Sequence, residues 1–245
     1  MSAEGVGPAV DALRGARSVV VLTGAGVSTA SGLPQFRGGG MWDDDALLAA
    51  HEVSALPGSL EVLWATWGPW RPVVAATAPN AAHRAIALLE QLVPGAMTVA
   101  TQNVDGLHQR AGSSVVAELH GSLFRSRCLS CDRSYHDEDT PVGIPSSPCC
   151  GAAARPDMTL FGEPLPFEAG RTAKVACRSA DVLLVAGTSG AVTTATGLAR
   201  YAAEYGARVV LVNAEPWGPD GARWLSTTVL GPVEVLLPDL VSRLR

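Results

Sequence analysis

Short apolar runs that end in small or polar residues recur along the chain. The clearest runs, rich in Val, Leu and Ala, span residues 18–22, 97–100, 181–186 and 208–212. Continuous apolar runs of this length predict strands that are buried on both faces, as in a parallel sheet. The segments that follow them are Thr23–Gly26, Thr101–Asn103, Gly187–Ser189 and Asn213–Glu215. Ligands of parallel α/β sheets bind outside the carboxyl ends of the strands, so these loops are predicted to form the functional site.

Apolar residues at helical spacing lie between the predicted strands. Ala82, Ile86 and Leu89 follow this spacing, and Asn80 is predicted to cap the helix at its N-terminus. Strands that alternate with helices predict an α/β fold built on a parallel sheet. Residues 38–78, rich in Gly, Trp and Pro, and residues 121–165, which contain most of the cysteines, interrupt the alternation. We interpret both stretches as insertions that form a small second domain.

The composition is that of a folded protein without a basic surface. Apolar residues make up 47% of the chain and charged residues 17%, which excludes a disordered chain or a coiled coil. The net charge is −5, whereas a sequence-independent nucleic-acid binder normally has a basic face. No apolar run approaches the ~20 residues of a membrane helix, and the N-terminus lacks the layout of a signal peptide. We therefore expect a soluble, cytoplasmic protein that contacts neither nucleic acid nor membrane.

The glycine turn after the first predicted strand is similar to a dinucleotide-binding loop. Glycines let a backbone approach a pyrophosphate, and the N-terminus of a following helix favours its negative charge. The G-x-G-x-x-G motif is incomplete, however, because Thr29 occupies the position of its third glycine. An acidic residue about 20 positions further on, at the end of a second strand, is also not evident. This turn by itself leaves nucleotide binding and a simple tight turn equally open.

Four of the five cysteines form a cluster in the second insertion. Cys128 and Cys131 have the C-x-x-C spacing of zinc sites, and Cys149 and Cys150 are adjacent. Clustered thiols without an export signal favour a metal over disulfides. Adjacent residues can chelate one ion only with a constrained backbone, so four cysteine ligands, three with another ligand, and no zinc all stay open. Cys177 lies apart and is interpreted as a small buried residue.

His120 is the candidate general base among the five histidines. It follows an apolar run at a predicted boundary between strand and loop, and a neutral imidazole near pH 7 can accept a proton from a hydroxyl. A structural role, which is more common for a histidine in a loop, stays open on this evidence. His83 and His108 fall in helical patterns and are interpreted as packing or capping residues. The histidines in the insertions, for which no partner is evident, are His51 and His136.

Several short blocks follow one another along the chain: Gly24–Ser28, Ser31–Gly38, Thr101–His108, Glu118–Gly121, Phe161–Glu163, Gly187–Ser189 and Asn213–Glu215. In their residues and their order, these blocks resemble the motifs of the sirtuins, the NAD-dependent protein deacylases. Ordered blocks over nearly the whole chain are far more specific than any one of them. One departure is Thr194, where the family usually has proline. The chain is identified from these blocks as a bacterial-type member of the family.

The resemblance implies a Rossmann-like domain with a parallel sheet, a small zinc-binding domain formed from the two insertions, and NAD in the cleft between them. The expected Rossmann-like domain comprises residues 1–37, 79–120 and 166–245. The small helical domain would comprise residues 38–78 and 121–165. Its zinc would be structural, and the expected ligands are Cys128, Cys131, Cys149 and Cys150.

The NAD site of the family maps onto the predicted loops. Contacts with the phosphates and the nicotinamide ribose are expected from Gly24, Ala25, Gly26, Ser28, Phe36 and Arg37. The other expected NAD contacts are Gln102, Asn103, Asp105, Gly187, Thr188, Ser189, Asn213 and Glu215. Carboxylates and amides suit ribose hydroxyls, and small residues admit phosphate to backbone N–H groups. For Asn103, Asp105 and Asn213 the alternative is capping of strand ends.

The family's reaction implies roles for the remaining blocks. The acyl-lysine oxygen attacks the nicotinamide ribose and displaces nicotinamide, and His120 then activates a ribose hydroxyl, with Asn103 as the second catalytic residue. Phe36 would shield the reaction from water. Free lysine and O-acyl-ADP-ribose are the other products, so NAD is consumed. The segment expected to pair with the substrate backbone as an added strand is Met158, Thr159, Leu160, Phe161, Gly162 and Glu163.

The acyl preference is predicted from two tryptophans. Family members that favour succinyl-like groups carry a Tyr and an Arg at the positions of Trp67 and Trp70, and Arg71 lies one place away. An acidic acyl group would bury an uncompensated carboxylate, so acetyl or longer apolar groups are expected. The alternative is that these tryptophans only pack the small domain.

Two other functions compete with a deacylase acting on acyl-lysine proteins. Mono-ADP-ribosyl transfer to protein keeps the fold and NAD, whereas a binding module would sense NAD or ADP-ribose without turnover. An intact His120 argues against a sensor, which needs no general base, and the substrate segment at residues 158–163 favours deacylation. We expect the deacylase to be a monomer.

Overall fold

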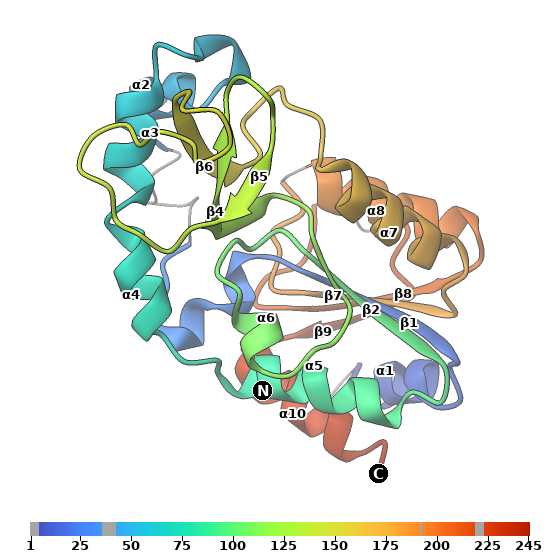
Figure 1. The fold of residues 1–245 in the computed structure, drawn as a ribbon. Coiled ribbons are helices and arrows are strands. Elements are labelled where there is room, and N and C mark those ends of the chain that lie inside the picture. Colours follow the sequence, from blue (N-terminus) through green and yellow to red (C-terminus); the bar gives the residue numbers. More distant parts are fainter. Residues whose placement is uncertain (1–4, 36–42, 192, 219–222) are drawn as a thin grey trace.

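Two β-sheets organise the computed structural model, which describes residues 5–35, 43–191, 193–218 and 223–245 (Figure 1). The larger sheet is parallel, with the strand order β3-β2-β1-β7-β8-β9. Its strands are β1 (Ser18–Thr23), β2 (Ala96–Thr101), β3 (Val116–Glu118), β7 (Val182–Ala186), β8 (Arg208–Asn213) and β9 (Thr227–Leu230). The four predicted strands are confirmed as β1, β2, β7 and β8.

Helices cover both faces of the large sheet, as its apolar strands require (Figure 1). One face carries α7 (Phe167–Arg178) and α8 (Thr193–Glu204), and the other carries α1 (Val6–Leu13), α5 (Ala81–Leu92) and α10 (Val233–Ser242). Along β1, Val19 and Val21 pack toward the second group, whereas Val20 and Leu22 pack toward the first. Among the described helices, none has both the length and the apolar character that crossing a bilayer requires.

The start of α5 is fixed by the cap that the sequence predicts. Asn80 Oδ1 accepts a hydrogen bond from the Ala82 N–H over 2.9 Å, and the Asn80 N–H donates to His83 Nδ1 over 3.3 Å. Asn80 Nδ2 also donates to the Val27 carbonyl over 2.8 Å. The cap therefore joins α5 to the loop after β1 and contributes about 1 kcal/mol to stability.

The smaller sheet lies within the second predicted insertion. It is antiparallel, with the order β5-β4-β6, and comprises β4 (Gly121–Cys128), β5 (Ser134–His136) and β6 (Ala154–Met158). The first insertion supplies α2 (Asp45–Ala50), α3 (Leu60–Trp67) and α4 (Trp70–Ala76), which lie beside this sheet (Figure 1). The sequence predicted the helices but not the sheet. The exact domain boundaries stay a prediction.

Arg71 of α4 is buried at 1% exposure and ties this helix to the small sheet. Its Nε donates to the Leu123 carbonyl over 2.9 Å, and its Nη2 donates to Ser126 Oγ over 3.0 Å. Its Nη1 lies 3.1 Å from Asp137 Oδ2, which completes a buried ion pair. The guanidinium is therefore fully committed to holding α4 in place.

Candidate active site

The carboxyl ends of the large-sheet strands border a cavity of about 830 Å³. Its size is within the range of about 300–1,000 Å³ that is typical of cofactor sites. The predicted site residues that line it are Gly24, Ala25, Gly26, Trp67, Gln102, Asn103, His120, Met158, Thr159, Leu160, Phe161, Gly187, Thr188, Ser189, Asn213 and Glu215. The structure thus brings together residues that are far apart in the sequence. Phe36 and Arg37 lie outside the described residues, so their predicted roles stay predictions.

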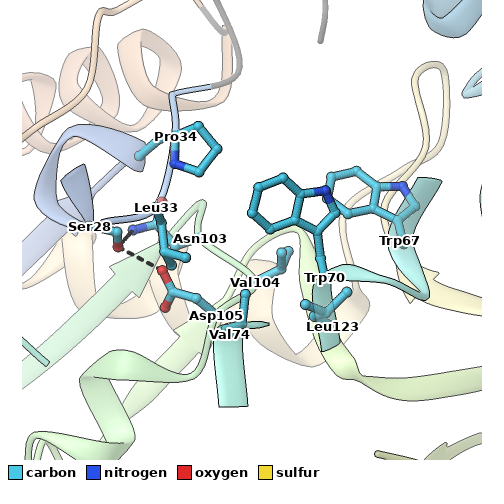
Figure 2. A pocket seen from close by; sticks show the side chains of 11 residues that line it. Ser28, Leu33, Pro34, Trp67, Trp70, Val74, Asn103, Val104, Asp105 and Leu123 are labelled. Atoms are coloured by element: carbon cyan, nitrogen blue, oxygen red, sulfur yellow. Dashed lines mark hydrogen bonds between the residues drawn. The ribbon is translucent and has the colours of Figure 1, made fainter. Parts of the chain in front are cut away.

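A smaller pocket of about 40 Å³ shares Asn103 and Trp67 with the cavity (Figure 2). Ser28 and Asp105 contribute polar groups to it, and Trp70 contributes an indole ring. The remaining lining is largely apolar and comprises Ala25, Leu33, Pro34, Val74, Val104 and Leu123. The pocket therefore has a small hydrogen-bonding end and a larger apolar wall.

The polar end of the pocket is one hydrogen-bonded group (Figure 2). Ser28 Oγ donates to Asp105 Oδ2 over 2.6 Å, and Asn103 Nδ2 donates to Ser28 Oγ and to the Gly24 carbonyl, both over 3.1 Å. Asp105 Oδ1 accepts from the Leu107 N–H over 2.9 Å and so satisfies the first backbone N–H of α6 (Leu107–Arg110). Burial raises the pKa of Asp105, and these hydrogen bonds oppose the rise. Asn103 uses its N–H groups within the protein, so Oδ1 is the side-chain atom that it can offer to a ligand.

The loops after β1 and β7 pack so closely that their backbones are in direct contact. The Gly26 N–H donates to the Gly187 carbonyl over 2.8 Å. A Cβ atom on Gly26 would lie 2.8 Å from that oxygen, and one on Gly187, whose φ is +59°, would lie 2.4 Å from the Val27 nitrogen. Both glycines are therefore required by contacts within the protein, in addition to any approach to a phosphate.

We expect Gly187→Ala to destabilise the protein by about 1–3 kcal/mol, because the added methyl group meets backbone and the residue has a positive φ. Chemical denaturation of the two proteins measures the difference. Gly197→Ala is the matched control, because Gly197 lies in α8 and its Cβ would meet nothing within 4 Å. This control should gain about 0.5–1 kcal/mol. Equal stability of wild type and Gly187→Ala would contradict the packing argument.

His120 lies in the short turn between β3 and β4, where the two sheets meet. Its carbonyl accepts the Thr159 N–H over 3.0 Å, and its ring forms a hydrogen bond with the Gln102 backbone. Partial burial lowers its pKa below the ordinary value of 6.5, against the opposing effect of that hydrogen bond. Gly121, with a φ of +79°, allows the chain to turn directly after it. The imidazole is therefore neutral at pH 7 and lines the cavity, as a general base requires.

The segment after β6 lines the cavity and forms hydrogen bonds with other parts of the protein. The Thr159 N–H donates to the His120 carbonyl, and the Phe161 carbonyl accepts the Val53 N–H over 2.9 Å. Met158 and Leu160 are both buried at 6% exposure. The main chain of this segment is therefore held in place by contacts within the protein, and its pairing with a substrate backbone stays a prediction.

Glu163, at the end of this segment, closes a turn. Its Oε2 accepts the Leu160 N–H over 2.9 Å, and its Oε1 accepts from Arg155 Nη2 over 2.5 Å. Gly162, with a φ of +78°, provides the left-handed conformation that the turn needs. Glu163 thus shapes the substrate segment through its internal contacts, and its predicted contact with substrate stays a prediction.

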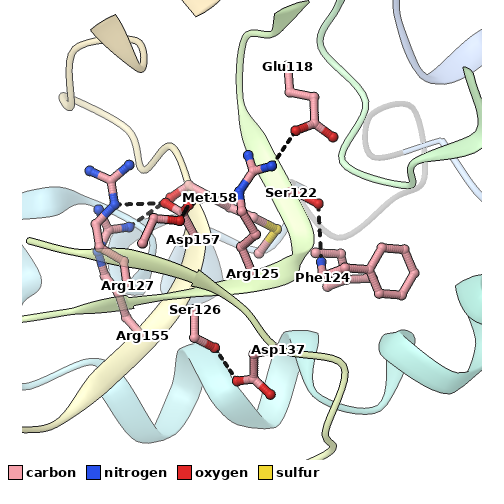
Figure 3. A network of polar contacts seen from close by, with 12 residues as sticks. Glu118, Ser122, Phe124, Arg125, Ser126, Arg127, Asp137, Arg155, Asp157 and Met158 are labelled. Carbon is pink, nitrogen blue, oxygen red and sulfur yellow. Dashed lines mark hydrogen bonds and ion pairs between the residues drawn. The ribbon is translucent and has the colours of Figure 1, made fainter. Parts of the chain in front are cut away.

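A polar network connects β3 of the large sheet to the small sheet (Figure 3). Arg125 Nη1 lies 2.6 Å from Glu118 Oε2 on β3, and its Nε lies 3.2 Å from Asp157 Oδ2 on β6. Asp157 also accepts from Arg127 Nε over 2.7 Å and from Ser134 Oγ over 2.5 Å. Burial would raise the pKa of Asp157, but Ser134 and the two guanidinium groups lower it below its usual range. The carboxylate is therefore charged and fixes the start of the substrate segment.

His51 is a cavity residue that the sequence analysis left without a partner. Its Nδ1 lies 2.7 Å from the Leu47 carbonyl, and its Nε2 accepts from Trp67 Nε1 over 2.8 Å. Burial lowers its pKa, so the ring is neutral and fixes the orientation of Trp67. The sequence around His51 contains no motif that would have indicated its place in the cavity.

The four clustered cysteines converge, including the adjacent pair that the spacing left open. Their Sγ atoms all lie within 4.8 Å of one another, with Cys128–Cys150 at 3.4 Å and Cys131–Cys149 at 3.1 Å. Four thiolates around one tetrahedral zinc lie about 3.8 Å apart, because each Zn–S bond is about 2.3 Å. Gly151, with a φ of +75°, permits the turn that aims both adjacent thiols inward. The donor set therefore fits structural zinc and leaves no coordination position for water.

The parallel sheet, the cavity at its carboxyl edge and the inserted cysteine cluster define a Rossmann-like protein with a small metal-binding unit. Residues 24–194 match the model of the Sir2 family. The chain is 49% identical over 214 residues to the NAD-dependent protein deacylase 2 of Pyrobaculum aerophilum, which covers 84% of this chain and 83% of the relative. The chain therefore belongs to the Sir2 family.

Solved structures agree with this assignment over nearly the whole chain. A Sir2 homologue in complex with NAD superposes with a TM-score of 0.88 at 34% identity, covering 98% of this chain and 93% of the other. Sir2 bound to an acetylated peptide superposes with a TM-score of 0.84 at 28% identity, covering 97% of this chain and 98% of the other. The predicted family and the Rossmann-like fold are confirmed.

Proposed function

We propose that this protein is an NAD-dependent protein-lysine deacylase that produces nicotinamide, O-acyl-ADP-ribose and free lysine. The observation that carries the proposal is the cavity, in which neutral His120 lies with the predicted NAD-binding loops and the substrate segment. Relatives of the Sir2 family that bear the name NAD-dependent protein deacylase support it. A neutral base, a dinucleotide-sized cavity and a rigid peptide-docking segment are the components that this chemistry needs.

The residues of the cavity divide the reaction between them. The loops after β1 and β7 offer backbone N–H groups and small side chains to phosphates, and Asn213 and Glu215 at the end of β8 suit ribose hydroxyls. We assign nicotinamide to the polar end of the smaller pocket, at Asn103 and Asp105, and the acyl group to its apolar side, at Trp70 and at Trp67, which also lines the large cavity. NAD supplies the ribose that receives the acyl group. His120 takes the proton from a ribose hydroxyl, and Met158–Phe161 align the acyl-lysine peptide.

The four cysteines would hold a structural zinc ion. Zinc at this position would cross-link the turn after β4 to the turn that precedes β6. Its contribution is to the stability of the small sheet and hence to the position of the substrate segment.

The apolar wall of the smaller pocket favours acetyl and longer apolar acyl groups over succinyl. Trp67 and Trp70 line it, and Arg71, the nearest cation in the sequence, is committed to Leu123, Ser126 and Asp137. A succinyl carboxylate would therefore be buried without a partner, which is costly.

We expect kcat/KM for acetyl-lysine peptides to exceed that for the matching succinyl-lysine peptides at least about tenfold. Steady-state release of nicotinamide with the two peptides measures the ratio. Trp70→Arg, which adds a cation to the pocket wall, should shift the ratio toward succinyl, whereas Arg84→Lys on the surface should leave it unchanged. Equal rates on both peptides in the wild type would contradict the preference.

Release of nicotinamide from NAD, with and without acyl peptides, tests the proposed function. Release that requires the peptide and yields free lysine supports a deacylase. Release that leaves ADP-ribose on protein would favour mono-ADP-ribosyl transfer, and tight NAD binding without turnover would favour a sensor. We expect the active form to be a cytoplasmic monomer without nucleic-acid or membrane partners, and light scattering of the purified protein tests its mass.

A further inference from the structure

Two histidines outside the proposed reaction form a buried pair beneath the ends of β1 and β2. His83 of α5 is 0% exposed, His108 of α6 is 1% exposed, and their ring centroids lie 4.9 Å apart. Burial lowers the pKa of His83 to about 4 and that of His108 to about 3. Both rings are therefore neutral at pH 7, and each has one N–H donor and one acceptor nitrogen.

The neighbours of His83 determine its tautomer. The Asn80 backbone N–H donates to His83 Nδ1, so Nδ1 is the acceptor and the proton lies on Nε2. Within the described residues, His83 Nε2 has no hydrogen-bond partner. The ring therefore presents a donor on the side away from the helix cap.

A chain of hydroxyls determines the tautomer of His108. Its Nε2 lies 2.9 Å from Thr23 Oγ1, and that hydroxyl donates to Thr101 Oγ1 over 2.8 Å. With Thr23 as the donor to Thr101, its single proton is used, so it accepts from His108 and the imidazole proton lies on Nε2; the reverse order of the two hydroxyls would place that proton on Nδ1. With Thr23 as the donor, His108 Nδ1 is an acceptor, and in the described part of the chain it has no partner. The unused donor of His83 and the unused acceptor of His108 are complementary.

Thr101 connects this series of hydrogen bonds to Asn103 and to the residue before His120. Its Oγ1 accepts the Asn103 N–H over 3.0 Å, and its carbonyl accepts the Leu119 N–H over 2.8 Å. Leu119 directly precedes His120. Thr23 and Thr101 are paired across β1 and β2, so the chain runs along the carboxyl ends of two central strands.

We propose that His108 is a positioning residue for Asn103. Its Nε2–H orients the hydroxyls of Thr23 and Thr101, so that Thr101 Oγ1 presents a lone pair to the Asn103 N–H. The expected effect of His108 on kcat rests on the proposed deacylase function. The series of hydrogen bonds from His108 to Asn103 is independent of that function.

The tautomers can be measured in the wild-type protein. Long-range ¹H–¹⁵N spectra of the imidazole rings at pH 7 should show both His83 and His108 as neutral Nε2–H tautomers. An Nδ1–H tautomer or a protonated ring at His108 would overturn the proposal. This measurement requires neither turnover nor a variant.

Paired substitutions test the consequence for Asn103. Thr101→Val and His108→Leu remove the hydrogen bonds, whereas Thr101→Ser and His108→Gln keep a hydroxyl and an N–H donor. We expect the first pair to speed hydrogen exchange of the Asn103 amide, and to lower kcat for nicotinamide release, about tenfold each with little change in KM. The second pair should stay within about threefold of wild type. Thr77→Val, which removes a hydroxyl bonded to the Val73 carbonyl away from the site, is the control and should change neither quantity.

The two proposals fail in different ways. If the wild-type protein shows no turnover, the proposed deacylase function is contradicted. Hydrogen exchange of the Asn103 backbone amide would still test the positioning role of His108. Equal exchange and equal kcat in Thr101→Val and Thr101→Ser would overturn the positioning role while leaving the deacylase intact. A thermal melt of each variant identifies unfolding, which would lower kcat and melting temperature together.

Discussion

His120→Ala should lower kcat for deacylation by about 10²–10⁴-fold, which is the usual contribution of a general base. The imidazole lies in the cavity between the NAD-binding loops and the substrate segment, and alanine leaves no group there to accept the proton. Affinity for NAD should change little, because the phosphate-binding loops are untouched. Single-turnover release of nicotinamide and of free lysine separates the first step from the later, base-dependent step.

The pH profile provides a second readout of His120. Burial lowers its pKa below 6.5, and the base acts in its neutral form, so the rate should decrease on the acidic side with a midpoint below pH 6.5. His136→Ala is the control, since His136 is exposed on β5 and should leave both rate and profile unchanged. Full activity in His120→Ala would contradict the proposed role.

Loss of zinc should unfold the small sheet. Structural zinc contributes about 10–16 kcal/mol of binding free energy in zinc-finger peptides, and the four thiols here have the same donor set. We expect Cys149→Ser to lose bound zinc and to lower the melting temperature far more than a core cysteine substitution would. Metal analysis should find one zinc per wild-type chain, and circular dichroism should report the unfolding.

Cys177→Ala is the matched control for the zinc prediction. Cys177 of α7 is fully buried, as the sequence predicted, and it packs in the apolar core between the helices α7 and α8 and the large sheet. Its replacement should cost about 1 kcal/mol and leave the zinc content unchanged. Retention of zinc and stability in Cys149→Ser would indicate that the adjacent cysteine is not a ligand.

The large sheet was predictable because its strands are buried on both faces. Their short length and the turn residues that bound them favour buried strands over helices, and the loops after parallel strands meet at one edge of the sheet. The edge strand β9 escaped prediction, because Val229 is its only fully buried residue. The strands of the small sheet carry Arg, Ser and Asp in place of an apolar alternation, since ion pairs replace apolar packing between them.

The candidate site was predictable where short motifs mark it and not where tertiary contacts build it. The resemblance to the sirtuins placed His120 and the glycine loops, which the structure brings to one cavity. By contrast, the fixed orientation of Trp67 depends on His51, which is 16 positions away in the sequence. The hydrogen bond between His108 and Thr23, which are 85 positions apart, likewise joins separate elements and is not encoded by a local pattern.

The contact of Arg125 with both sheets restricts how this protein can be recombined with its relatives. Glu118 belongs to the large sheet and Asp157 to the small one, yet one guanidinium serves both. A chimera that exchanged only the small sheet would have to carry a compatible partner for Glu118, or leave this carboxylate with the Gln109 amide as its remaining side-chain partner. A chimera that is to keep this ion-pair network therefore has to take Glu118, Arg125 and Asp157 from the same parent protein.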